Sequence, residues 1–518
     1  MNITLPSIIS SGMVIEKHAR IWGKAKDLKS ITIIFNGNEI TAPVTDEKWE
    51  VFLDTPDFGG PYEMQIEDII LTDIYVGYVF LLCGQSNMET PASRVRIKYE
   101  EDFKNLAHTP EIRIFQIGKG HSFVKAKDNC NGIWRAKSPE TIDNTYAMTF
   151  YLSEFLKSDL DAPLGFIECA VGGSRIEAWL SENSVRYMGY ASELLRLFRY
   201  DGFIERLIES DEERMNIWYK NTNDADSGIK ENWHEPEYIP NGWKSRKLTT
   251  PWAEDIGLLN GVVWFRKDFL LDTKIAGQPG RIFLGTITDS DIVFLNGEII
   301  GRTDYKYPPR VYPIREGLLK EGKNTLVIRV TSEREYGGFT ADKDYYIETS
   351  TGDVDISDEW LYCIGYAGAE LAPATQFTLY PCSLYNAMLY PVMSFSISAF
   401  LWYQGESNDG FPYLYDMLLS RFITDIRASF GDIPFISVQL PNYDAGEFNE
   451  NWAIIREKQA SVLNYRSTAL IITNDIGEDN DLHPLNKRDV AKRMTAAILY
   501  YLKNIEFQND KVLLSIFP

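Results

Sequence analysis

A serine and a histidine stand out as residues that together could carry out nucleophilic chemistry. Ser86 lies within residues 84–88 (Gly-Gln-Ser-Asn-Met), and His483 lies within residues 481–484 (Asp-Leu-His-Pro). A serine hydroxyl is a weak nucleophile until a base takes its proton, and histidine suits this task because its pKa lies near neutrality. Taken singly, Ser86 would more simply cap a helix, and His483 would lie in a surface loop. We therefore expect a nucleophile and a general base only if the fold brings the two side chains into one cleft.

A third group would have to orient the imidazole, and two carboxylates are candidates. Asp481 lies two residues before His483, and Glu406 lies in residues 402–408 (Trp-Tyr-Gln-Gly-Glu-Ser-Asn). A carboxylate beside an imidazole fixes its tautomer and stabilises the imidazolium that forms during catalysis. Both alternatives stay open, with Asp481 preferred.

Donors for a developing oxyanion can be found in the same segments. Residues 171–179 (Val-Gly-Gly-Ser-Arg-Ile-Glu-Ala-Trp) contain Gly172 and Gly173, whose backbone N–H groups could point at the reacting carbonyl. Gln404 and Asn408 offer amide side chains for the same purpose. A helix starting after Ser86 would add partial positive charge where the oxyanion forms. These patterns favour acyl transfer through serine.

The chain that must position these groups divides into regions of different pattern. Residues 1–70 read as short strands with an Asn-Gly hairpin at positions 36–37, which predicts a small β domain. Residues 71–205 and 361–518 alternate strands with helices, as an α/β domain with a parallel sheet would. Between them, residues 206–360 begin with a polar stretch and continue as short alternating strands, which predicts an inserted β-sandwich. The simplest organisation is one α/β domain interrupted by this insertion.

The α/β regions supply the elements next to the candidate residues. The nearly continuous apolar run over 74–83 predicts a strand that is covered on both faces and ends just before Ser86. Ligands bind outside the carboxyl ends of parallel strands, where Ser86 and residues 402–408 would lie. Further strands are expected at 113–116, 164–169, 396–402, 434–440 and 469–473, and helices at 144–160, 412–429, 452–463 and 487–502.

Composition excludes several classes of function. With 52 Lys and Arg against 74 Asp and Glu, the net charge is −22, which argues against nucleic acid and anionic membrane surfaces as partners. Five cysteines without a Cys-x-x-Cys pair and only five histidines predict neither a metal site nor a disulfide framework, and we expect no cofactor. The first residues lack the pattern of a secretory signal, so we expect a cytoplasmic protein, or a secreted or periplasmic one if a leader has been removed.

The four candidate segments, taken in order, resemble the sialate O-acetylesterase family, a branch of the SGNH hydrolases. These segments are residues 84–88, 172–179, 402–408 and 481–484. Residues 384–388 (Leu-Tyr-Asn-Ala-Met) resemble the family's approach to its third segment, and the region over 206–360 is similar to galactose-binding-like sandwiches of glycosidases. The resemblance implies a flavodoxin-like, three-layer α/β/α fold. Typical members place an Asp three residues before the His, where this chain has Asn480.

The resemblance also implies roles and a substrate class. Ser86 would attack the acetyl carbonyl and His483 would relay the proton, with the oxyanion held by the backbone of Ser86 and Gly172 or Gly173 and by Gln404, or less expectedly Asn408. Arg175, Glu177 and Trp179 would contact substrate, an acetylated mono- or oligosaccharide. Sialic acids, xylan fragments and other acetylated oligosaccharides are alternatives, and the chain could form a homo-oligomer. A catalytically inactive carbohydrate-binding protein, or a lipase or peptidase, are the competing classes.

Overall fold

The computed structural model describes residues 2–334, 337–446, 449–503 and the strand at 511–514. Its contacts divide the chain into two compact units. Unit 1 comprises Met1–Phe203 and Gln376–Pro518, and unit 2 comprises Ile204–Thr375. Unit 1 is therefore assembled from two stretches of sequence that unit 2 separates. Among the described residues, no helix is both long enough and apolar enough to span a membrane.

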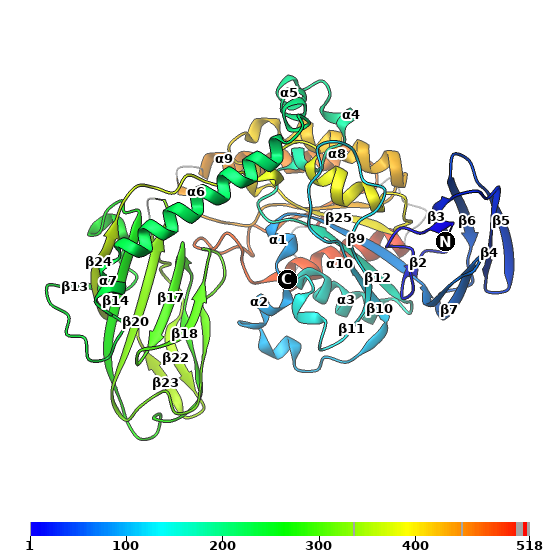
Figure 1. Ribbon diagram of the computed structural model, residues 1–518. Helices are drawn as coiled ribbons and strands as arrows, with labels where there is room; N and C mark the ends of the chain where they lie inside the picture. Colours follow the sequence, from blue (N-terminus) through cyan, green and yellow to red (C-terminus); the bar gives the residue numbers. More distant parts are fainter. Residues whose placement is uncertain (1, 335–336, 447–448, 504–510, 515–518) are drawn as a thin grey trace. The chain divides into compact units, whose positions relative to one another are not determined.

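An eight-stranded sheet forms the centre of unit 1 (Figure 1). Seven of its strands run parallel, and only the edge strand β11 is antiparallel to its neighbour. The fold class is thus α/β, as expected from the alternation of strands and helices. The order across the sheet is β11 (Trp134–Lys137), β10 (Thr109–Gln116), β12 (Leu164–Ala170), β9 (Tyr78–Gly84), β25 (Ala399–Tyr403), β26 (Phe435–Val438), β27 (Thr468–Ile471) and β28 (Lys511–Leu514).

Helices cover both faces of this sheet, which explains why its central strands are apolar on both sides. Helices α3 (Ala147–Asp159) and α10 (Lys487–Lys503) lie on one face, and α8 (Tyr415–Phe430) and α9 (Asn449–Gln459) lie on the other (Figure 1). Phe80 and Phe166 belong to the core beneath α3 and α10. On the opposite face, Phe422 of α8 packs against Trp402 with 4.3 Å between ring centroids. The shorter helices of unit 1 are α1 (Ser86–Glu89), α2 (Ala92–Arg96), α4 (Glu182–Val185) and α5 (Gly189–Phe198).

The start of the chain forms two small sheets, and the expected strand over 74–83 is wrong as a single element. It is split at Gly77, where a Cβ would lie 2.0 Å from the carbonyl oxygen of Pro163. β8 (Ile69–Val76) belongs to the N-terminal sheets and β9 to the central sheet. The N-terminal sheets therefore continue past residue 70 to the end of β8, and they belong to unit 1, so a separate N-terminal β domain stays a prediction. One sheet has the order β1 (Ile3–Thr4), β3 (His18–Ala25), β6 (Lys48–Asp54), and the other β2 (Val14–Ile15), β8, β7 (Gly59–Ile66), β4 (Ser30–Phe35), β5 (Asn38–Pro43).

Unit 2 contains a six-stranded and a four-stranded antiparallel sheet that share one hydrophobic core. The expected boundary at residue 360 is wrong, because it would cut β24 (Glu359–Ala367), which pairs with β14 (Gly261–Leu271). The six-stranded order is β13 (Lys244–Lys247), β24, β14, β20 (Gly322–Ser332), β17 (Ser290–Leu295), β18 (Glu298–Thr303), and the four-stranded order is β19 (Val311–Ile314), β15 (Gly280–Leu284), β22 (Tyr345–Thr349), β23 (Gly352–Asp355).

The Asn-Gly hairpin expected at positions 36–37 is confirmed, and the structure contains a second one at positions 296–297. Asn36-Gly37 joins β4 to β5, and Asn296-Gly297 joins β17 to β18. In each pair both residues have positive φ, between 49° and 84°. That conformation suits Asn and Gly in two-residue turns, so the local sequence explains these two connections.

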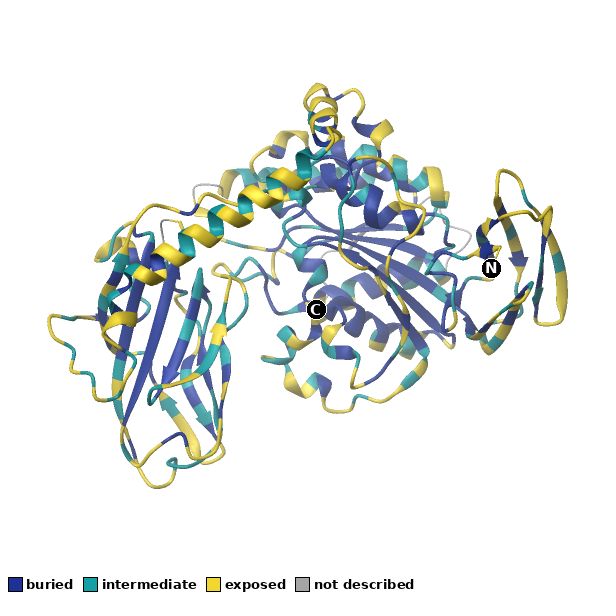
Figure 2. Cartoon of the chain, in the orientation of Figure 1, coloured by how far each residue is buried: buried dark blue, intermediate teal, exposed yellow. Residues whose placement is uncertain are grey.

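The polar stretch after residue 205 forms the long helix α6 (Phe203–Ala225), followed by the short helix α7 (Ser227–Lys230). Most of α6 is exposed, and Thr222 is its only fully buried residue (Figure 2). Toward unit 2, Asn223 Oδ1 accepts a hydrogen bond from Arg329 and the Trp218 indole donates one to the carbonyl of Ala369. Apolar residues such as Leu207, Met215 and Trp218 recur at helical spacing along α6, but they are only partly buried and lie among many charged residues.

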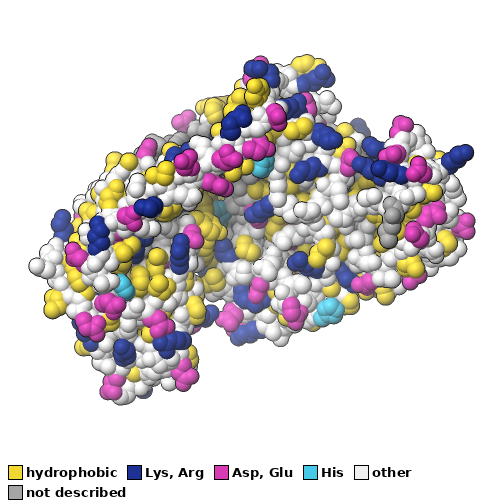
Figure 3. Space-filling model, in the orientation of Figure 1, with side chains coloured by type: hydrophobic (Ala, Val, Ile, Leu, Met, Phe, Trp, Pro, Cys, Tyr) yellow, Lys and Arg dark blue, Asp and Glu magenta, His cyan; other side chains and the backbone are white. Residues whose placement is uncertain are grey.

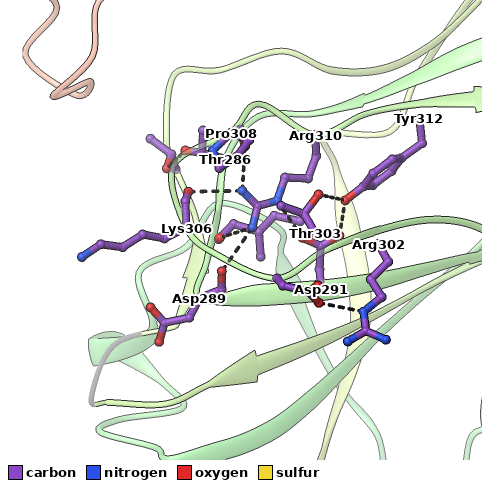
Figure 4. A network of polar contacts seen from close by, with 12 residues as sticks. Thr286, Asp289, Asp291, Arg302, Thr303, Lys306, Pro308, Arg310 and Tyr312 are labelled. Carbon is purple, nitrogen blue, oxygen red and sulfur yellow. Dashed lines mark hydrogen bonds and ion pairs between the residues drawn. The ribbon is translucent and has the colours of Figure 1, made fainter. Parts of the chain in front are cut away.

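A buried ion pair lies inside unit 2 (Figure 4). Arg310 donates from Nε to Asp291 Oδ1 at 2.6 Å, and both side chains are completely buried. The guanidinium also donates to four backbone carbonyls, and Tyr312 donates its hydroxyl to Asp291 Oδ2 at 2.7 Å. This full set of partners compensates the desolvation of both charges, which is the condition for a stable buried pair.

Candidate active site

The structure brings Ser86 and His483 into direct contact. His483 Nε2 lies 2.7 Å from Ser86 Oγ, although the residues are 397 positions apart in sequence. Ser86 is the first residue of α1, directly after β9, and His483 lies in the loop before α10 with 3% of its surface exposed. A hydroxyl and an imidazole at this distance can share the proton whose removal makes serine nucleophilic.

A sharp turn at Gly84 presents Ser86 at the carboxyl edge of the sheet. Gly84 has φ +144°, and a Cβ there would lie 2.1 Å from the carbonyl oxygen of Tyr403 on the neighbouring strand β25. Only glycine fits this close approach. The next residue, Gln85, accepts hydrogen bonds through Oε1 from the backbone N–H groups of Gly405 and Ser407. The nucleophile turn is thereby attached to the segment after β25.

Asn87, which follows the nucleophile, connects three parts of the site and was missed by sequence reasoning. Its Nδ2 donates to Glu406 Oε1 at 2.5 Å and to the carbonyl of Leu482 at 3.0 Å. Its Oδ1 accepts a hydrogen bond from Lys487 Nζ at 2.5 Å. Leu482 immediately precedes His483, so one amide joins the nucleophile turn to the loop of the base. The only sequence signal was its position beside Ser86.

Burial shifts both ionisable partners of Asn87. Desolvation raises the pKa of Glu406 to about 6, and the hydrogen bond from Asn87 and the charge of Lys487 oppose this. Desolvation lowers the pKa of Lys487 to about 7, and the charge of Arg94 lowers it further, while Glu406, Asp481 and Glu478 raise it. Both groups are thus moved toward neutral pH, as is common beneath catalytic residues.

The two carboxylates expected near the imidazole occupy different places. Asp481 Oδ1 accepts a hydrogen bond from the backbone N–H of His483 at 2.8 Å, so this carboxylate stabilises the loop. Glu406 lies buried beneath the site and contacts Asn87. Which of the two orients the imidazole stays a prediction.

The backbone N–H of Gly172 lies next to the nucleophile and carries a hydrogen bond. It donates to Glu89 Oε2 at 2.6 Å, and Glu89 also forms an ion pair with Lys119. A Cβ on Gly172 would lie 3.5 Å from the Cβ of Ser86, which confirms how closely this turn approaches the nucleophile. Gly172 can serve an oxyanion only when Glu89 releases this N–H. Gly173 follows with φ +70°.

The expected role of Gln404 as an oxyanion donor is corrected, because its side chain is fully engaged elsewhere. Gln404 Nε2 donates to the carbonyl of Ser174 and to Asn408 Oδ1, while Oε1 accepts from the hydroxyl of Tyr415. Asn408 in turn donates to Glu177 Oε2 at 2.9 Å. Gln404 and Asn408 are both buried, so they hold the loops that surround the site together.

Of the three residues expected to contact substrate, only Arg175 is accessible enough to do so. Trp179 is completely buried, donates to Ser174 Oγ and packs against Trp402, so it belongs to the core. Glu177 is buried and bound by Asn408. Arg175 donates through Nε to the carbonyl of Ser407 at 3.0 Å, and its guanidinium lies 5.7 Å from the ring of Phe411. For Trp179 and Glu177 the expected substrate contact is therefore wrong.

The arrangement supports acyl transfer at a serine. It combines a hydroxyl in contact with an imidazole, glycine backbone at the nucleophile and buried groups beneath the pair. In the described part of the chain, His, Cys, Asp and Glu residues do not gather in groups of three that could hold a metal ion.

Comparison with models of known protein families assigns the chain to one of them. Residues 76–235 and 366–499, more than half of the sequence, match the family model "Carbohydrate esterase, sialic acid-specific acetylesterase". The chain belongs to this family. Its two matched segments contain Ser86 and His483, respectively, so the family pattern covers both members of the contact pair.

Relatives of the carbohydrate esterase family have been described in mammals. The chain is 28% identical to the human sialate O-acetylesterase over 212 residues, which is 35% of this chain and 40% of the human protein. It is 26% identical to the mouse sialate O-acetylesterase, with 35% of this chain and 38% of the mouse protein covered. The matches thus span about two fifths of the length of these relatives.

A solved structure shares the fold over nearly the whole chain. This is a carbohydrate acetylesterase from Xanthomonas citri, with a TM-score of 0.56 and 19% sequence identity, covering 96% of this chain and 75% of that one. At this identity the likeness shows the fold alone.

Proposed function

We propose that the protein is a carbohydrate O-acetylesterase that works through an acetyl-serine intermediate. The observation that carries this proposal is the 2.7 Å contact between Ser86 Oγ and His483 Nε2 in a chain of the carbohydrate esterase family. Neither residue type is exceptional alone. Their contact at the carboxyl edge of a parallel sheet is what a serine hydrolase requires.

In the proposed reaction, Ser86 Oγ attacks the acetyl carbonyl while His483 Nε2 takes the hydroxyl proton. The resulting oxyanion would be held by the backbone N–H groups of Ser86 and of Gly172 or Gly173. Collapse of this intermediate releases the sugar hydroxyl, which receives the proton from His483. A water molecule, deprotonated by the same imidazole, then attacks the acetyl-serine and releases acetate. One of the two carboxylates, Asp481 or Glu406, would stabilise the positively charged imidazolium of His483.

The proposed substrates are acetylated mono- or oligosaccharides, with sialic acids and xylan fragments as alternatives. Arg175 supports a substrate that carries a carboxylate, because planar guanidinium groups bind carboxylates in a bidentate manner. Only its Nε is engaged in a hydrogen bond within the described residues. Acidic and basic side chains are interspersed on the molecular face in Figure 3, so such recognition would have to be local.

We also propose that unit 2 is a galactose-binding-like sandwich inserted into an SGNH-type, flavodoxin-like domain. The two antiparallel sheets with one shared core support the sandwich, and the central parallel sheet supports the hydrolase domain. The expected segments 71–205, 206–360 and 361–518 then shift to the bounds of unit 2, Ile204–Thr375.

The test of this function is acetate release from a panel of acetylated sialic acids, xylo-oligosaccharides and manno-oligosaccharides. Ser86→Ala is expected to lower the turnover of the preferred substrate by on the order of 10⁴-fold or more, with unchanged thermal unfolding. Ser158→Ala, at an exposed serine of α3, serves as control and keeps full activity. Equal acetate release by Ser86→Ala and the native chain would contradict the proposal.

A further inference from the structure

Three contacts converge on the amide of Asn87 from residues 319, 395 and 400 positions away in the sequence. They come from Glu406 in the segment after β25, Leu482 in the loop of the base, and Lys487 in α10. Each contact is a hydrogen bond of 3.0 Å or less, and the side chain of Asn87 is completely buried. These three hydrogen bonds go to groups that surround the Ser86–His483 pair.

Lys487 is an unexpected residue for this buried position. Its side chain is almost completely buried, and the charges of Glu406, Asp481 and Glu478 favour its protonated form, although none of the ion pairs among the described residues includes it. Its Nζ donates a hydrogen bond to the amide oxygen of Asn87 at 2.5 Å and lies 5.7 Å from the ring centroid of Tyr403. Burying an ammonium group without a directly paired charge is strongly unfavourable. Stability alone would be better served by an apolar residue, so its placement indicates a role at the site.

The geometry points to Asn87 as a positioning residue, which Glu406 and Lys487 fix in one orientation so that it holds the His483 loop against the nucleophile turn. Glu406 and Lys487 specify the orientation of the amide, because Glu406 accepts from Nδ2 and Lys487 donates to Oδ1. The second hydrogen of Nδ2 is then directed to the carbonyl of Leu482, one residue before the base. This inference rests on the proposed serine chemistry and extends it to residues that touch neither substrate nor the reacting atoms.

The central test is Asn87→Asp, which keeps the size and the acceptor for Lys487 but removes both donated hydrogen bonds. The readout is the rate at which a fluorophosphonate probe labels Ser86, since it forms the Oγ–P bond with loss of fluoride and needs no sugar. We expect at least tenfold slower labelling than in the native chain. With p-nitrophenyl acetate we expect kcat to fall at least tenfold while KM stays within twofold.

A second variant, Lys487→Met, removes the group that fixes the amide from the other side. Labelling is expected to slow at least fivefold. Lys137→Met is the matched control, because Lys137, on the edge strand β11, is similarly buried but donates to Ser153 and Glu154 of α3. It should label Ser86 at the native rate. Thermal unfolding of all variants is measured in parallel and identifies any chain that fails to fold. If Asn87→Asp does not fold, Asn87→Ser takes its place.

The outcomes separate this inference from the proposed function. Slow labelling of Asn87→Asp and Lys487→Met supports the positioning role even if no acetylated sugar on the panel is hydrolysed. Native labelling rates in both variants, or a change in KM alone, overturn the positioning role and leave the esterase proposal intact. Failure of the native chain to label at Ser86 overturns both.

Discussion

Three carboxyl groups of unit 1 are buried so deeply that water no longer stabilises their charge. Desolvation raises the pKa of Glu16 and of Glu168 to about 7, and that of Glu406 to about 6. These values exceed the ordinary Glu pKa, so the folded chain retains protons that the unfolded chain has released. The stability that each group contributes is present below its unfolded pKa, near 4.5, and is lost as the pH rises through its folded pKa.

Glu168 offers the clearest test of this linkage, because it lies on β12 away from the Ser86–His483 pair. Glu168→Gln removes this titration. Between pH 5 and pH 8, the free energy of unfolding of the native chain should therefore fall by about 2–3 kcal/mol more than that of the variant. Denaturant unfolding at both pH values measures this difference. Glu193→Gln, at an exposed carboxylate on α5, should leave the native pH dependence unchanged.

At the scale of single residues, the sequence indicated the reactive types better than their partners. Ser86 could be selected because it follows an apolar strand, and His483 because the chain has only five histidines. Gln404 is bound by Asn408 of its own segment, by Tyr415 and by the distant Ser174, and no local pattern indicates that these contacts occupy its amide. Asn87 was missed for the same reason, since its importance lies in contacts with distant segments.

At the scale of elements, two glycines at the ends of neighbouring strands should respond differently to the same substitution. Gly84→Ala places a Cβ 2.1 Å from a backbone oxygen of β25 at φ +144°, so we expect loss of the folded state or destabilisation by more than about 3 kcal/mol. Gly172→Ala meets nothing closer than 3.3 Å and should fold, but its methyl group lies beside the nucleophile. We expect it to slow acetate release at least tenfold.

Thermal unfolding and turnover of the two alanine variants check this contrast. A stable and fully active Gly84→Ala chain would contradict the role assigned to the turn between β9 and α1. Native turnover of Gly172→Ala would show that a methyl group at this position does not obstruct the reaction at Ser86.

Element prediction succeeded where burial imposes a periodic pattern and failed where it does not. The strands covered on both faces were visible as apolar runs, yet the change of sheet at Gly77 was hidden within one such run because both sheets bury their strands. The helix α6 was missed because its segment is mostly polar and Thr222 is its only fully buried residue, although apolar residues such as Leu207 and Met215 recur at helical spacing.

At the scale of the whole molecule, the two units have separate cores, and the pair Arg310–Asp291 belongs to unit 2 alone. Asp291→Ala leaves a buried guanidinium without its counter-charge, which typically destabilises by 3–5 kcal/mol. Calorimetry should show the transition of unit 2 lowered by roughly 6–20 °C. Below that temperature, fluorophosphonate labelling of Ser86 should keep the native rate.

The control for this prediction is Asp304→Ala, which removes an exposed partner of Arg302 in the same region. Exposed ion pairs contribute about 0–1 kcal/mol, so its transition should move little. If Asp291→Ala were to move the transitions of both units equally, the two cores would be unfolding as one body.

Changes in residue pattern predicted the order of the regions along the chain. They did not predict the residues at which each region begins and ends. The limit expected at residue 360 falls inside β24, the last strand of unit 2. Long-range pairing with β14 is what assigns β24 to unit 2.

The discontinuity of unit 1 also affects how the chain is made on the ribosome. When residues 1–203 have emerged, β9 already has β12 on one side, but its other neighbour β25 is not yet synthesised. An unpaired strand edge that also carries the nucleophile turn is then exposed while all of unit 2 is translated. Unit 2, which is continuous in sequence, can complete its core first. Synonymous changes that slow translation between residues 376 and 403 would lengthen this exposure and should favour aggregation of the nascent chain.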